Sequence, residues 1–422
     1  MSTATMPAPA KKPLPNEGRP GYKHTKLGWI PEEWDTVPLD RVVAKGKPIV
    51  YGIVQAGPNV EGGVPYIKST DISDGHVSPG SLQRTSEAIA GKYKRSIVTP
   101  GDIVFSLRGD IPSTAIVPVE LLVANLTQGT ARISVSSEFL NGFVDYSLHA
   151  PLVAKRINIF AKGSTFQEIS LTDLRKVEIA KPSSLPEQRR IAQVLGAWDQ
   201  AIATTQQLLA AQQQRKHGLM QELLSGVYHR CKKVNIGDVA EEVKERHTMG
   251  EDYTVLSCTK YKGFVSSLEY FKKQVFSEDR SNYKVIRRGQ FGFPANHVEE
   301  GSIDLLRLHD IGLVSPIYVI FEFDRDKVNS EFMYYLFKTD RYRHIFLTST
   351  NSSVDRRGSL RWNDFKNLWV PLPKREEQDR LARLFQHMDQ QIEMTENYLA
   401  NLTTQKRGLM QVLLTGEKRL EA

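Results

Sequence analysis

Apolar residues recur along two segments of the chain in alternating steps of four and three. In the first segment the apolar or small positions are Ile191, Leu195, Trp198, Ile202, Thr205 and Leu209. In the second they are Leu381, Phe385, Met388, Ile392, Thr395 and Leu399, each 190 residues later. This spacing places one apolar stripe along an α-helix and is typical of the seam of a coiled coil. The pattern predicts two long helices of the same design.

The two segments also begin and end alike. Glu187-Gln188 opens the first and Glu377-Gln378 opens the second. Near their ends the first has Gly218, Leu219 and Met220, and the second has Gly408, Leu409 and Met410. Each segment is close to forty residues, or about 55–60 Å at ~1.5 Å rise per residue. Because such a helix is too long to be buried within one globular domain, we expect the two copies to pair.

Glycines stand at matching positions in both segments. Gly226 and Gly416 follow the last Leu pair, where a left-handed residue commonly ends a helix. Gly218 and Gly408 fall inside the predicted helices, where glycine costs roughly 1 kcal/mol relative to alanine. We therefore expect a partner helix to approach the backbone closely at these two positions.

The segments that precede the helices have a mixed pattern. Short β-like runs lie between turn signals at 64–67, 102–107 and 131–135, and residues 143–160 have helical spacing. The second half repeats this plan loosely, since residues 287–293 correspond to 99–105 at an offset of 188. The pattern predicts an α+β protein with two mixed α/β domains separated by two long helices that pair as a coiled coil.

These patterns divide the chain into six segments. We predict a disordered lead at 1–20, a first domain at 21–182, a first spacer helix at 183–226, a second domain at 227–373, a second spacer helix at 374–417 and a tail at 418–422. The lead is rich in Ala, Pro and Lys and has no apolar core segment, which argues against a signal peptide.

Composition narrows the class of protein. At 422 residues the chain can form two or three domains with cores of their own. Cys231 and Cys258 are the only cysteines, which excludes a disulfide framework and favours a reducing compartment. No apolar run reaches the ~18–20 residues of a membrane span. The net charge of +8 lies mainly in the globular halves, which supports a polyanionic partner without establishing one.

Motifs for chemistry are missing from the sequence. It contains neither a phosphate-binding Gly-x-x-x-x-Gly-Lys-Ser/Thr loop nor an Asn-Pro-Pro-Tyr-like adenine-methyltransferase motif. Glu242-Val243-Lys244 has the form of half a nuclease motif, but Asp238 lies too close to be a ligand on a separate strand, so a charged surface is the favoured interpretation. No spacing of His and Cys predicts a metal site. We expect a protein that is not an enzyme.

On these features the chain resembles the specificity subunit of a type I restriction-modification system. The resemblance rests on the N-terminal segment Tyr22…Gly28-Trp29-Ile30-Pro31…Trp34, the helix that opens at Glu187-Gln188 and closes at Gly218-Leu219-Met220…Gly226, and the second domain and helix. The second half departs from the pattern, because it lacks the Trp-Pro-Trp segment and starts at Val227.

The resemblance implies a function in DNA recognition. The helices would pack antiparallel and hold two target-recognition domains about a pseudo-twofold axis, and each domain would read one half of a split DNA site from the major groove. Helix length would set the gap between the half-sites, at ~34 Å per DNA turn. Two methyltransferase (M) subunits would methylate adenine with S-adenosylmethionine, and two restriction (R) subunits would use ATP and Mg for cleavage. The protein would be cytoplasmic and nucleoid-associated, without a membrane.

Residues suited to base or phosphate contacts lie in turns and loops of both domains. In the first domain the candidates are Lys68, Ser69, Thr70, Arg108, Lys162, Ser164, Thr165 and Gln167. In the second they are Lys260, Lys262, Asn296, His297, Ser352, Ser353, Arg356 and Arg357. Ordinary solvated loops are the alternative interpretation for each. The stripe residues and the Gly-Leu-Met positions of both helices are the candidates for the coiled coil and for partner docking.

Two other functions fit parts of the pattern. In the first, the chain is a coiled-coil scaffold whose domains bind proteins. In the second, it is the recognition module of a fused restriction-methylation enzyme. Salt separates the scaffold from DNA reading, because phosphate-driven binding weakens steeply as the salt concentration rises. A chain with two domains and two helices but no catalytic motif favours a separate subunit over the fused enzyme.

Overall fold

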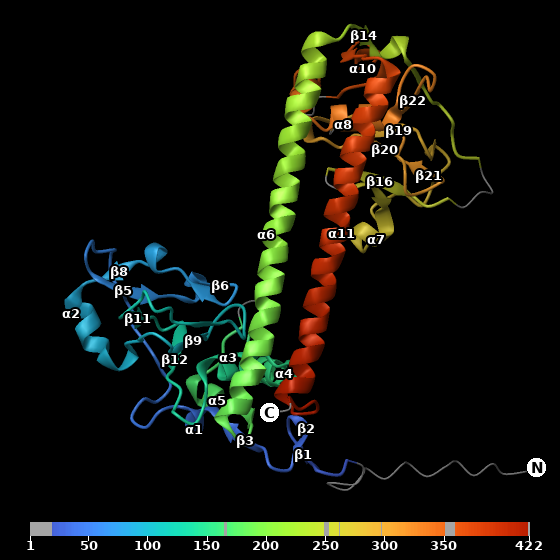
Figure 1. Ribbon diagram of the computed structural model, residues 1–422. Coiled ribbons are helices and arrows are strands. Elements are labelled where there is room, and N and C mark those ends of the chain that lie inside the picture. The colour runs from blue at the N-terminus through green and yellow to red at the C-terminus, as the bar shows by residue number, and fades with distance from the viewer. Residues whose placement is uncertain are drawn as a thin grey trace, which may run out of the picture. The chain divides into compact units, whose positions relative to one another are not determined.

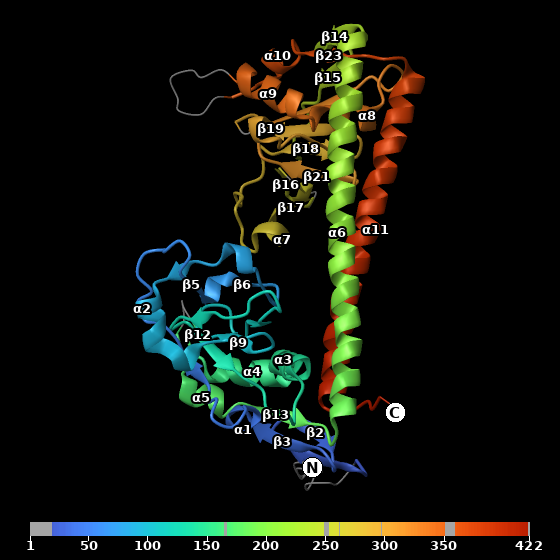
Figure 2. The ribbon, with the colours of Figure 1, turned by 60° about the vertical axis from the view of Figure 1, so that its left-hand side comes forward.

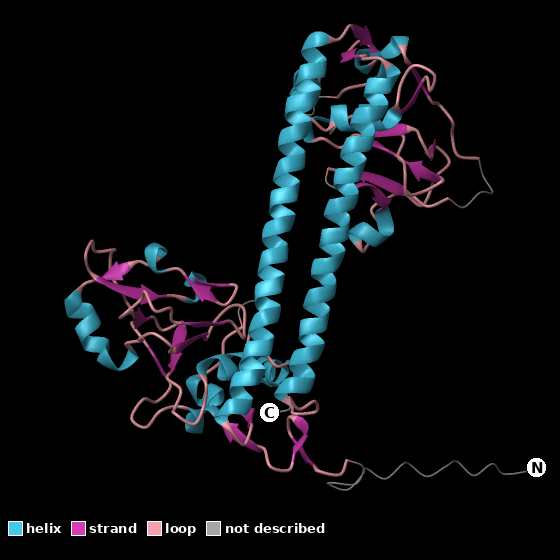
Figure 3. Cartoon of the chain, viewed as in Figure 1, coloured by secondary structure: helices cyan, strands magenta, loops and turns pink. Residues whose placement is uncertain are grey.

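The chain divides into two compact units, and each long helix contributes one part to each unit. A computed structural model describes residues 19–163, 167–248, 253–260, 262–296, 298–350 and 359–420. Unit 1 comprises Met1–Thr204 and Leu399–Ala422, and unit 2 comprises Thr205–Tyr398. The long helices are α6 (Leu185–Arg230) and α11 (Arg375–Leu414) (Figure 1). Both units combine short, mostly antiparallel strands with helices that follow them in the chain, which confirms the predicted α+β class (Figure 3).

Besides its parts of α6 and α11, unit 1 contains short strands and helices that precede α6. Its strands are β1 (Tyr22–Thr25), β2 (Gly28–Pro31), β3 (Asp35–Pro38), β4 (Val50–Tyr51), β5 (Val64–Ile67), β6 (Ile72–Ser73), β7 (His76–Val77), β8 (Arg84–Thr85), β9 (Ile103–Ser106), β10 (Thr114–Ile116), β11 (Asn125–Leu126), β12 (Thr130–Ile133) and β13 (Glu178–Lys181). Its helices before α6 are α1 (Leu39–Val42), α2 (Glu87–Ala90), α3 (Asn141–His149), α4 (Pro151–Phe160) and α5 (Leu171–Arg175).

Unit 2 has the corresponding elements between α6 and α11. Its strands are β14 (Lys233–Asn235), β15 (Ala240–Glu242), β16 (Leu256–Thr259), β17 (Gly263–Ser266), β18 (Lys284–Arg287), β19 (Phe291–Pro294), β20 (Asp304–Leu305), β21 (Ile311–Val314), β22 (Tyr318–Phe323) and β23 (Trp369–Pro371). Its helices are α7 (Ser267–Phe271), α8 (Ser330–Phe337), α9 (Asp340–Ser349) and α10 (Trp362–Phe365).

The same antiparallel sheet lies at the centre of each unit. Its strand order is β10-β9-β12-β4 in unit 1 and β20-β19-β22-β15 in unit 2. The register is also shared, because Thr130 pairs with Ser106 and Tyr318 pairs with Pro294, each position displaced by 188. Helices α3, α4 and α5 of unit 1 correspond to α8, α9 and α10 of unit 2, which occur in the same order. The loose sequence repeat between the halves is therefore a duplication of the fold.

The apolar stripes of the long helices enter the cores of both units. In unit 1, Ile191 and Leu195 of α6 share a buried cluster with Met410 and Leu413 of α11, and with residues of the domain such as Phe143. Burying a large apolar side chain stabilises the fold by about 1.5–3 kcal/mol. Figure 2 shows α3 beside this first part of α6. The helix ends are thus parts of a globular core.

The core of unit 2 is aromatic. Phe291 of β19 stacks on Phe321 of β22 at a centroid distance of 5.2 Å, and Phe293 lies 4.8 Å from Phe365 of α10. The same cluster contains Met220, Leu224 and Val227 of α6 and Leu381, Ala382, Phe385 and Met388 of α11. Rings that meet edge to face or offset add to the energy of area burial. As in unit 1, both long helices contribute to the core.

The two long helices run antiparallel within each unit. In unit 1, Lys406 pairs with Asp199, and further along Arg419 pairs with Glu187 at 2.6 Å. As the position on the C-terminal segment increases, the position on α6 falls, which defines antiparallel packing. In unit 2, Lys216 pairs with Asp389 and Arg230 pairs with Glu377, with the same sense. The predicted antiparallel pairing is confirmed within each unit.

Helix α6 continues past its predicted end. Gly226 is not a left-handed cap, because the helix runs through it to Arg230. Val227 is fully buried in the unit 2 core, and this burial stabilises the additional turn. The strand that starts the second domain accordingly begins at Lys233 instead of at residue 227. Gly416 does have a positive φ of 69° just after α11, as predicted.

Two other sequence expectations are corrected. A Cβ at Gly218 or Gly408 would meet no atom within 4 Å, so no helix approaches the backbone there. Both glycines face outward, and nothing in the structure explains their presence. Residues 143–160 form two helices instead of one, because Pro151 starts α4 and cannot donate the hydrogen bond that would continue α3.

The N-terminal segment packs against the far end of the chain. Trp34 is fully buried, and the Tyr22 hydroxyl donates a hydrogen bond to the Gly416 carbonyl at 3.2 Å. A Cβ at Gly416 would collide with Pro31, so this close approach requires glycine. Arg419, in the predicted tail, pairs with Glu187 of α6. Strands β1 and β2 lie beside the C-terminal end of α11 (Figure 1).

A buried glutamine near the start of each long helix binds the domain that precedes that helix. The Gln188 side chain accepts a hydrogen bond from the Leu140 amide at 2.9 Å and donates one to the Glu138 carbonyl at 3.1 Å. Gln378 does the same with the Asn329 amide at 2.8 Å and the Lys327 carbonyl at 3.1 Å. Each domain is therefore attached to the helix that follows it in sequence.

We predict that removing this attachment destabilises the fold. Gln378→Ala should lower the free energy of unfolding by about 1–3 kcal/mol, because the Asn329 amide and the Lys327 carbonyl lose their buried partner. Gln390→Ala, an exposed change on the same helix, is the control and should stay within about 0.5 kcal/mol of the wild type. Urea unfolding monitored by circular dichroism measures both; equal losses would contradict the proposed attachment.

Candidate nucleic-acid interface

Three of the predicted DNA-contacting residues of unit 1 line one cleft. The cleft has a volume of about 350 Å³, and Ser69, Thr70 and Arg108 are on its wall. A 3₁₀ turn after β5 presents Ser69 and Thr70, and this turn is closed by a hydrogen bond from the Lys68 amide to the Asp71 carboxylate at 2.8 Å. Hydroxyl and guanidinium groups side by side suit a phosphate or a base edge.

The base of the loop at 162–168 lies beside Arg108. The Arg108 side chain is about half exposed and donates a hydrogen bond to the Glu168 carboxylate at 3.0 Å. Lys162 and Glu168 exchange backbone hydrogen bonds at 2.9 Å, and the Gly109 amide donates to the Gln167 carbonyl at 3.0 Å. The fold thus brings Lys162 and Gln167 to the cleft region. Ser164 and Thr165 lie outside the described residues.

Lys68 has a different environment. Its ammonium group lies 3.8 Å from Asp71 and 3.3 Å from the Gln83 side-chain oxygen. It is not among the residues that line the cleft. The other walls come from Ile72, Ser73, Asp74, Ser106, Gly109, Asp110 and Ser113. These residues were not predicted from the sequence, because short polar side chains in turns give no signal of their own.

A buried polar cluster lies next to the cleft wall. The Thr114 hydroxyl donates a hydrogen bond to Asp145 at 2.5 Å and lies 2.7 Å from Nε2 of His149. Burial raises the pKa of the Asp145 carboxyl and lowers the pKa of the His149 imidazole. Neither side chain lines the cleft. The cluster therefore fixes α3 against β10 and is a structural support, with no reacting group in contact with the cleft.

In unit 2 the predicted lysines lie on the β16–β17 hairpin. Lys260 and Lys262 are exposed at its turn, and the Lys262 ammonium lies 5.8 Å from the centroid of the Tyr270 ring. The Lys262 amide donates to the Thr259 hydroxyl at 3.1 Å, which closes the turn. Gly263 has a φ of 61° and lies against the buried carboxylate of Asp304. The hairpin thus packs closely against a buried carboxylate.

Asn296 lies at the end of β19 and is half-buried. The neighbouring Ala295 carbonyl accepts a hydrogen bond from the Leu360 amide at 2.7 Å, so Asn296 is near the chain that leaves the loop at 351–358. That loop and His297 lie outside the described residues, and with them the candidates Ser352, Ser353, Arg356 and Arg357.

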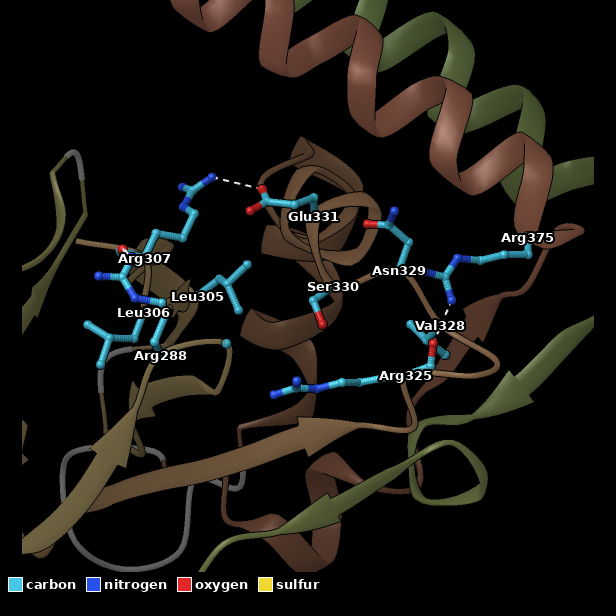
Figure 4. A pocket seen from close by; sticks show the side chains of 11 residues that line it. Arg288, Leu305, Leu306, Arg307, Arg325, Val328, Asn329, Ser330, Glu331 and Arg375 are labelled. Carbon is cyan, nitrogen blue, oxygen red and sulfur yellow. Dashed lines mark hydrogen bonds and ion pairs between the residues drawn. The ribbon is translucent and has the colours of Figure 1, made fainter. Parts of the chain in front are cut away.

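Unit 2 also contains a pocket rich in arginine, of about 570 Å³ (Figure 4). Arg288, Arg307, Arg325 and Arg375 line it, from segments that are far apart in sequence. Arg307 pairs with Glu331 at 3.0 Å, Arg288 pairs with Asp310 at 2.7 Å, and Arg375 donates to the Arg325 carbonyl at 2.5 Å. Carboxylates offset much of the positive charge. None of these arginines was predicted from the sequence as a site residue, because only the fold brings them together.

The predicted coiled-coil residues of the long helices face the interior, except Gly218 and Gly408, which are exposed. Every stripe position is buried or half-buried, and so are Leu219, Met220, Leu409 and Met410. These side chains therefore form the helix seam and the adjoining cores. A subunit that docks on the helices would have to use their other faces, where Leu208 and Tyr398 are about half exposed.

The described part of the chain contains neither a metal-binding cluster nor a membrane-spanning helix. Across residues 19–420, apart from the undescribed gaps, no group of three His, Cys, Asp or Glu side chains could hold a metal ion. No helix among those residues is both long and apolar enough to span a membrane.

Comparison with known sequences identifies relatives. Residues 31–212 match the family model described as the type I restriction modification DNA specificity domain. The chain is 29% identical over 204 residues to the EcoBI type I restriction enzyme specificity subunit of Escherichia coli. The aligned segment spans 47% of this chain and 42% of that protein. It is 22% identical to the MjaVIII specificity subunit of Methanocaldococcus jannaschii over 93% of this chain and 94% of that one.

Solved structures share the fold. One similar structure comes from a study of complex assembly and conformational transition of the type I R-M system. It has a TM-score of 0.57 and 16% identity, and the match covers 92% of this chain and 99% of the other. The S subunit of a type I restriction-modification system from M. genitalium has a TM-score of 0.53 and 15% identity, with 90% and 96% covered. At these identities the likeness supports the fold alone.

The β16–β17 hairpin gives a prediction about stability. Gly263→Ala places a methyl group against Asp304 in addition to the strained backbone, whereas Gly75→Ala at the corresponding position of unit 1 has positive φ and open space. Gly75→Ala should cost about 1–2 kcal/mol for the left-handed backbone, and Gly263→Ala about 1–3 kcal/mol more for overpacking. Urea unfolding measures both; equal losses would show that the contact with Asp304 is unimportant.

Proposed function

We propose that this chain, which belongs to the family of type I restriction-modification specificity subunits, is the DNA-reading subunit of a methyltransferase and restriction complex. Each unit would read one half of a split DNA site, and α6 and α11 would set the gap between the halves. The observation that carries the proposal is the duplication: one sheet order and register in both units, on two helices that repeat at an interval of 190 residues.

The divergence between the units supports the reading of two different half-sites. The unit 1 cleft presents Ser69, Thr70 and Arg108, whereas the matching region of unit 2 presents the Lys260 and Lys262 hairpin. Side chains of these types make the direct contacts to base edges and phosphates. Two copies of one fold with different polar groups on their loops are suited to an asymmetric bipartite sequence.

In this proposal the chemistry belongs to partner subunits. The buried Asp145 and His149 are not among the described residues that line the unit 1 cleft. Two methyltransferase subunits would bring S-adenosylmethionine and flip an adenine in each half-site. Two restriction subunits would bring ATP and Mg. This chain would contribute recognition and assembly in the cytoplasm.

The central test is modified-base sequencing of DNA from cells that express the chain with its neighbouring methyltransferase. Methyladenine should appear at one split motif, and it should be absent when the chain is omitted. This result would give both half-sites and the gap between them. An assembled, active methyltransferase with the same methylation in both cultures would favour the protein scaffold.

Arg108 gives a prediction at the level of one residue. Arg108→Ala should weaken binding of the assembled complex to its target duplex about tenfold, or ~1.4 kcal/mol, because one charge-assisted contact is lost. Lys26→Ala is the control, since Lys26 is exposed and does not line the cleft. Fluorescence anisotropy at several salt concentrations distinguishes the two classes of contact: a reduced salt slope indicates a phosphate, and an unchanged slope with relaxed specificity indicates a base. An equal effect of both variants would remove Arg108 from the interface.

A further inference from the structure

In each unit a tyrosine, an aspartate and a lysine from three different elements meet. In unit 1 the Tyr146 hydroxyl of α3 donates a hydrogen bond to Oδ2 of Asp199 on α6 at 2.6 Å. The Lys406 ammonium of α11 pairs with Oδ1 of the same carboxylate and lies 5.4 Å from the centroid of the Tyr146 ring. One carboxylate therefore binds the domain through one oxygen and the other helix through the second.

Unit 2 repeats the arrangement with the helices exchanged. The Tyr335 hydroxyl of α8 donates to Oδ2 of Asp389 at 2.6 Å, and here the aspartate is on α11. The lysine is Lys216 of α6, which pairs with Oδ1 of Asp389 and lies 5.4 Å from the Tyr335 ring centroid. Both lysines are about four-fifths buried, with 20% and 19% of their side chains exposed. Two units with different surfaces thus share this contact in atomic detail.

The two ion pairs specify the same alignment of the helices. Asp199 and Lys216 are 17 residues apart on α6, and Asp389 and Lys406 are 17 residues apart on α11. When two helices pair antiparallel, contacts with equal spacing on both helices define one register. Each unit by itself therefore gives the same register between α6 and α11.

The aspartate and the lysine have different tasks. Asp199, together with Gln188, attaches the first domain to α6, and Asp389, together with Gln378, attaches the second domain to α11. The lysine always comes from the other helix. It therefore connects the helix that carries one domain to the helix that carries the other.

An apolar stripe alone specifies this register weakly. If α11 slid along α6 by one turn, or ~5.4 Å, most stripe residues would meet another apolar residue. A partly buried charge specifies the register more strongly, because after a slip its partner carboxylate would lie a full turn away. Polar groups in a helix seam are known to select one register at some cost in stability.

From this geometry we infer that Lys216 and Lys406 are register-determining residues, which fix the gap between the two half-sites of the DNA. The inference rests on the proposed DNA-reading function. A slip of one turn would shift one domain relative to the other by ~5.4 Å along the helix axis. This shift corresponds to about one to two base pairs at ~3.4 Å each. The lysines contact no DNA in this scheme and act by positioning.

The test is the double variant Lys216→Met and Lys406→Met, expressed with the methyltransferase and analysed by modified-base sequencing. Methionine keeps the length and packs well against an aromatic ring. The half-sites should stay the same while motifs with gaps changed by one or two base pairs become methylated, at 10% or more of the level at the wild-type gap. Arginine at both positions should restore the single gap, since it retains the charge.

The matched control is Arg215→Met and Arg407→Met. These exposed residues are the immediate neighbours of the two lysines, and their replacement removes the same charge. The control should keep one gap. If the lysine variant also keeps one gap at full efficiency, the inference is wrong. If the wild-type chain directs no methylation at a split motif, the proposed function itself fails.

A second measurement does not depend on DNA. Nε2 of Gln213 on α6 donates a hydrogen bond to Oε1 of Glu396 on α11 at 3.4 Å. Gln213→Cys with Glu396→Cys should therefore cross-link rapidly in a background without Cys231 and Cys258. Gln213→Cys with Ala400→Cys lies one turn further along α11, samples a displaced register and should react slowly. In the Lys→Met background this displaced pair should react at least several-fold faster. An unchanged cross-linking pattern would overturn the inference even if the variant is inactive in methylation.

Discussion

The burial of one apolar stripe on each long helix is the constraint on which the rest of the structure depends. Helix α6 has 46 residues and helix α11 has 40, and neither can cover its stripe by itself. The structure covers the ends of both stripes with the domains, so that Ile191 and Leu195 belong to the unit 1 core and Leu381 and Phe385 to the unit 2 core. Each compact unit therefore contains part of both helices, and the helices are not independent spacers.

Polar contacts then determine what the apolar surface leaves open. Apolar burial is non-directional, so it favours contact between a domain and a helix without choosing one position. The buried Gln188 and Gln378 choose that position, because each satisfies an amide and a carbonyl of the domain backbone. Such groups are costly to leave unpaired in a core, which makes the geometry specific.

Duplication explains which features are shared by the units and which differ. The central sheet, its register and the helix attachments recur in both units. The loops do not: Arg108 and Glu168 form an ion pair in unit 1, whereas unit 2 has its arginine pocket at Arg288 and Arg325. A shared framework with different loops allows two sequences to be read by one type of domain.

The sequence by itself determined the elements that depend on local spacing. The stripe predicted both long helices and their pairing, and the repeat predicted a duplicated α+β fold, because periodicity reports directly on which face of an element is buried. Gly226 was misread as a cap because the burial of Val227 overrides a local signal. Gly218 and Gly408 were assigned a helix contact that the packing does not contain.

Only the tertiary structure decided which distant polar residues meet. It placed Ser69, Thr70 and Arg108 in one cleft, although nothing in their spacing shows that they are neighbours. It also joined Tyr146, Asp199 and Lys406, which are separated by up to 260 positions. A hydrogen bond or an ion pair requires its two groups to be placed to within a few tenths of an ångström, and this placement exists only after the apolar surfaces have packed. Periodicity can therefore predict the helices and their stripe, while the cleft and the register contacts follow from the packed fold.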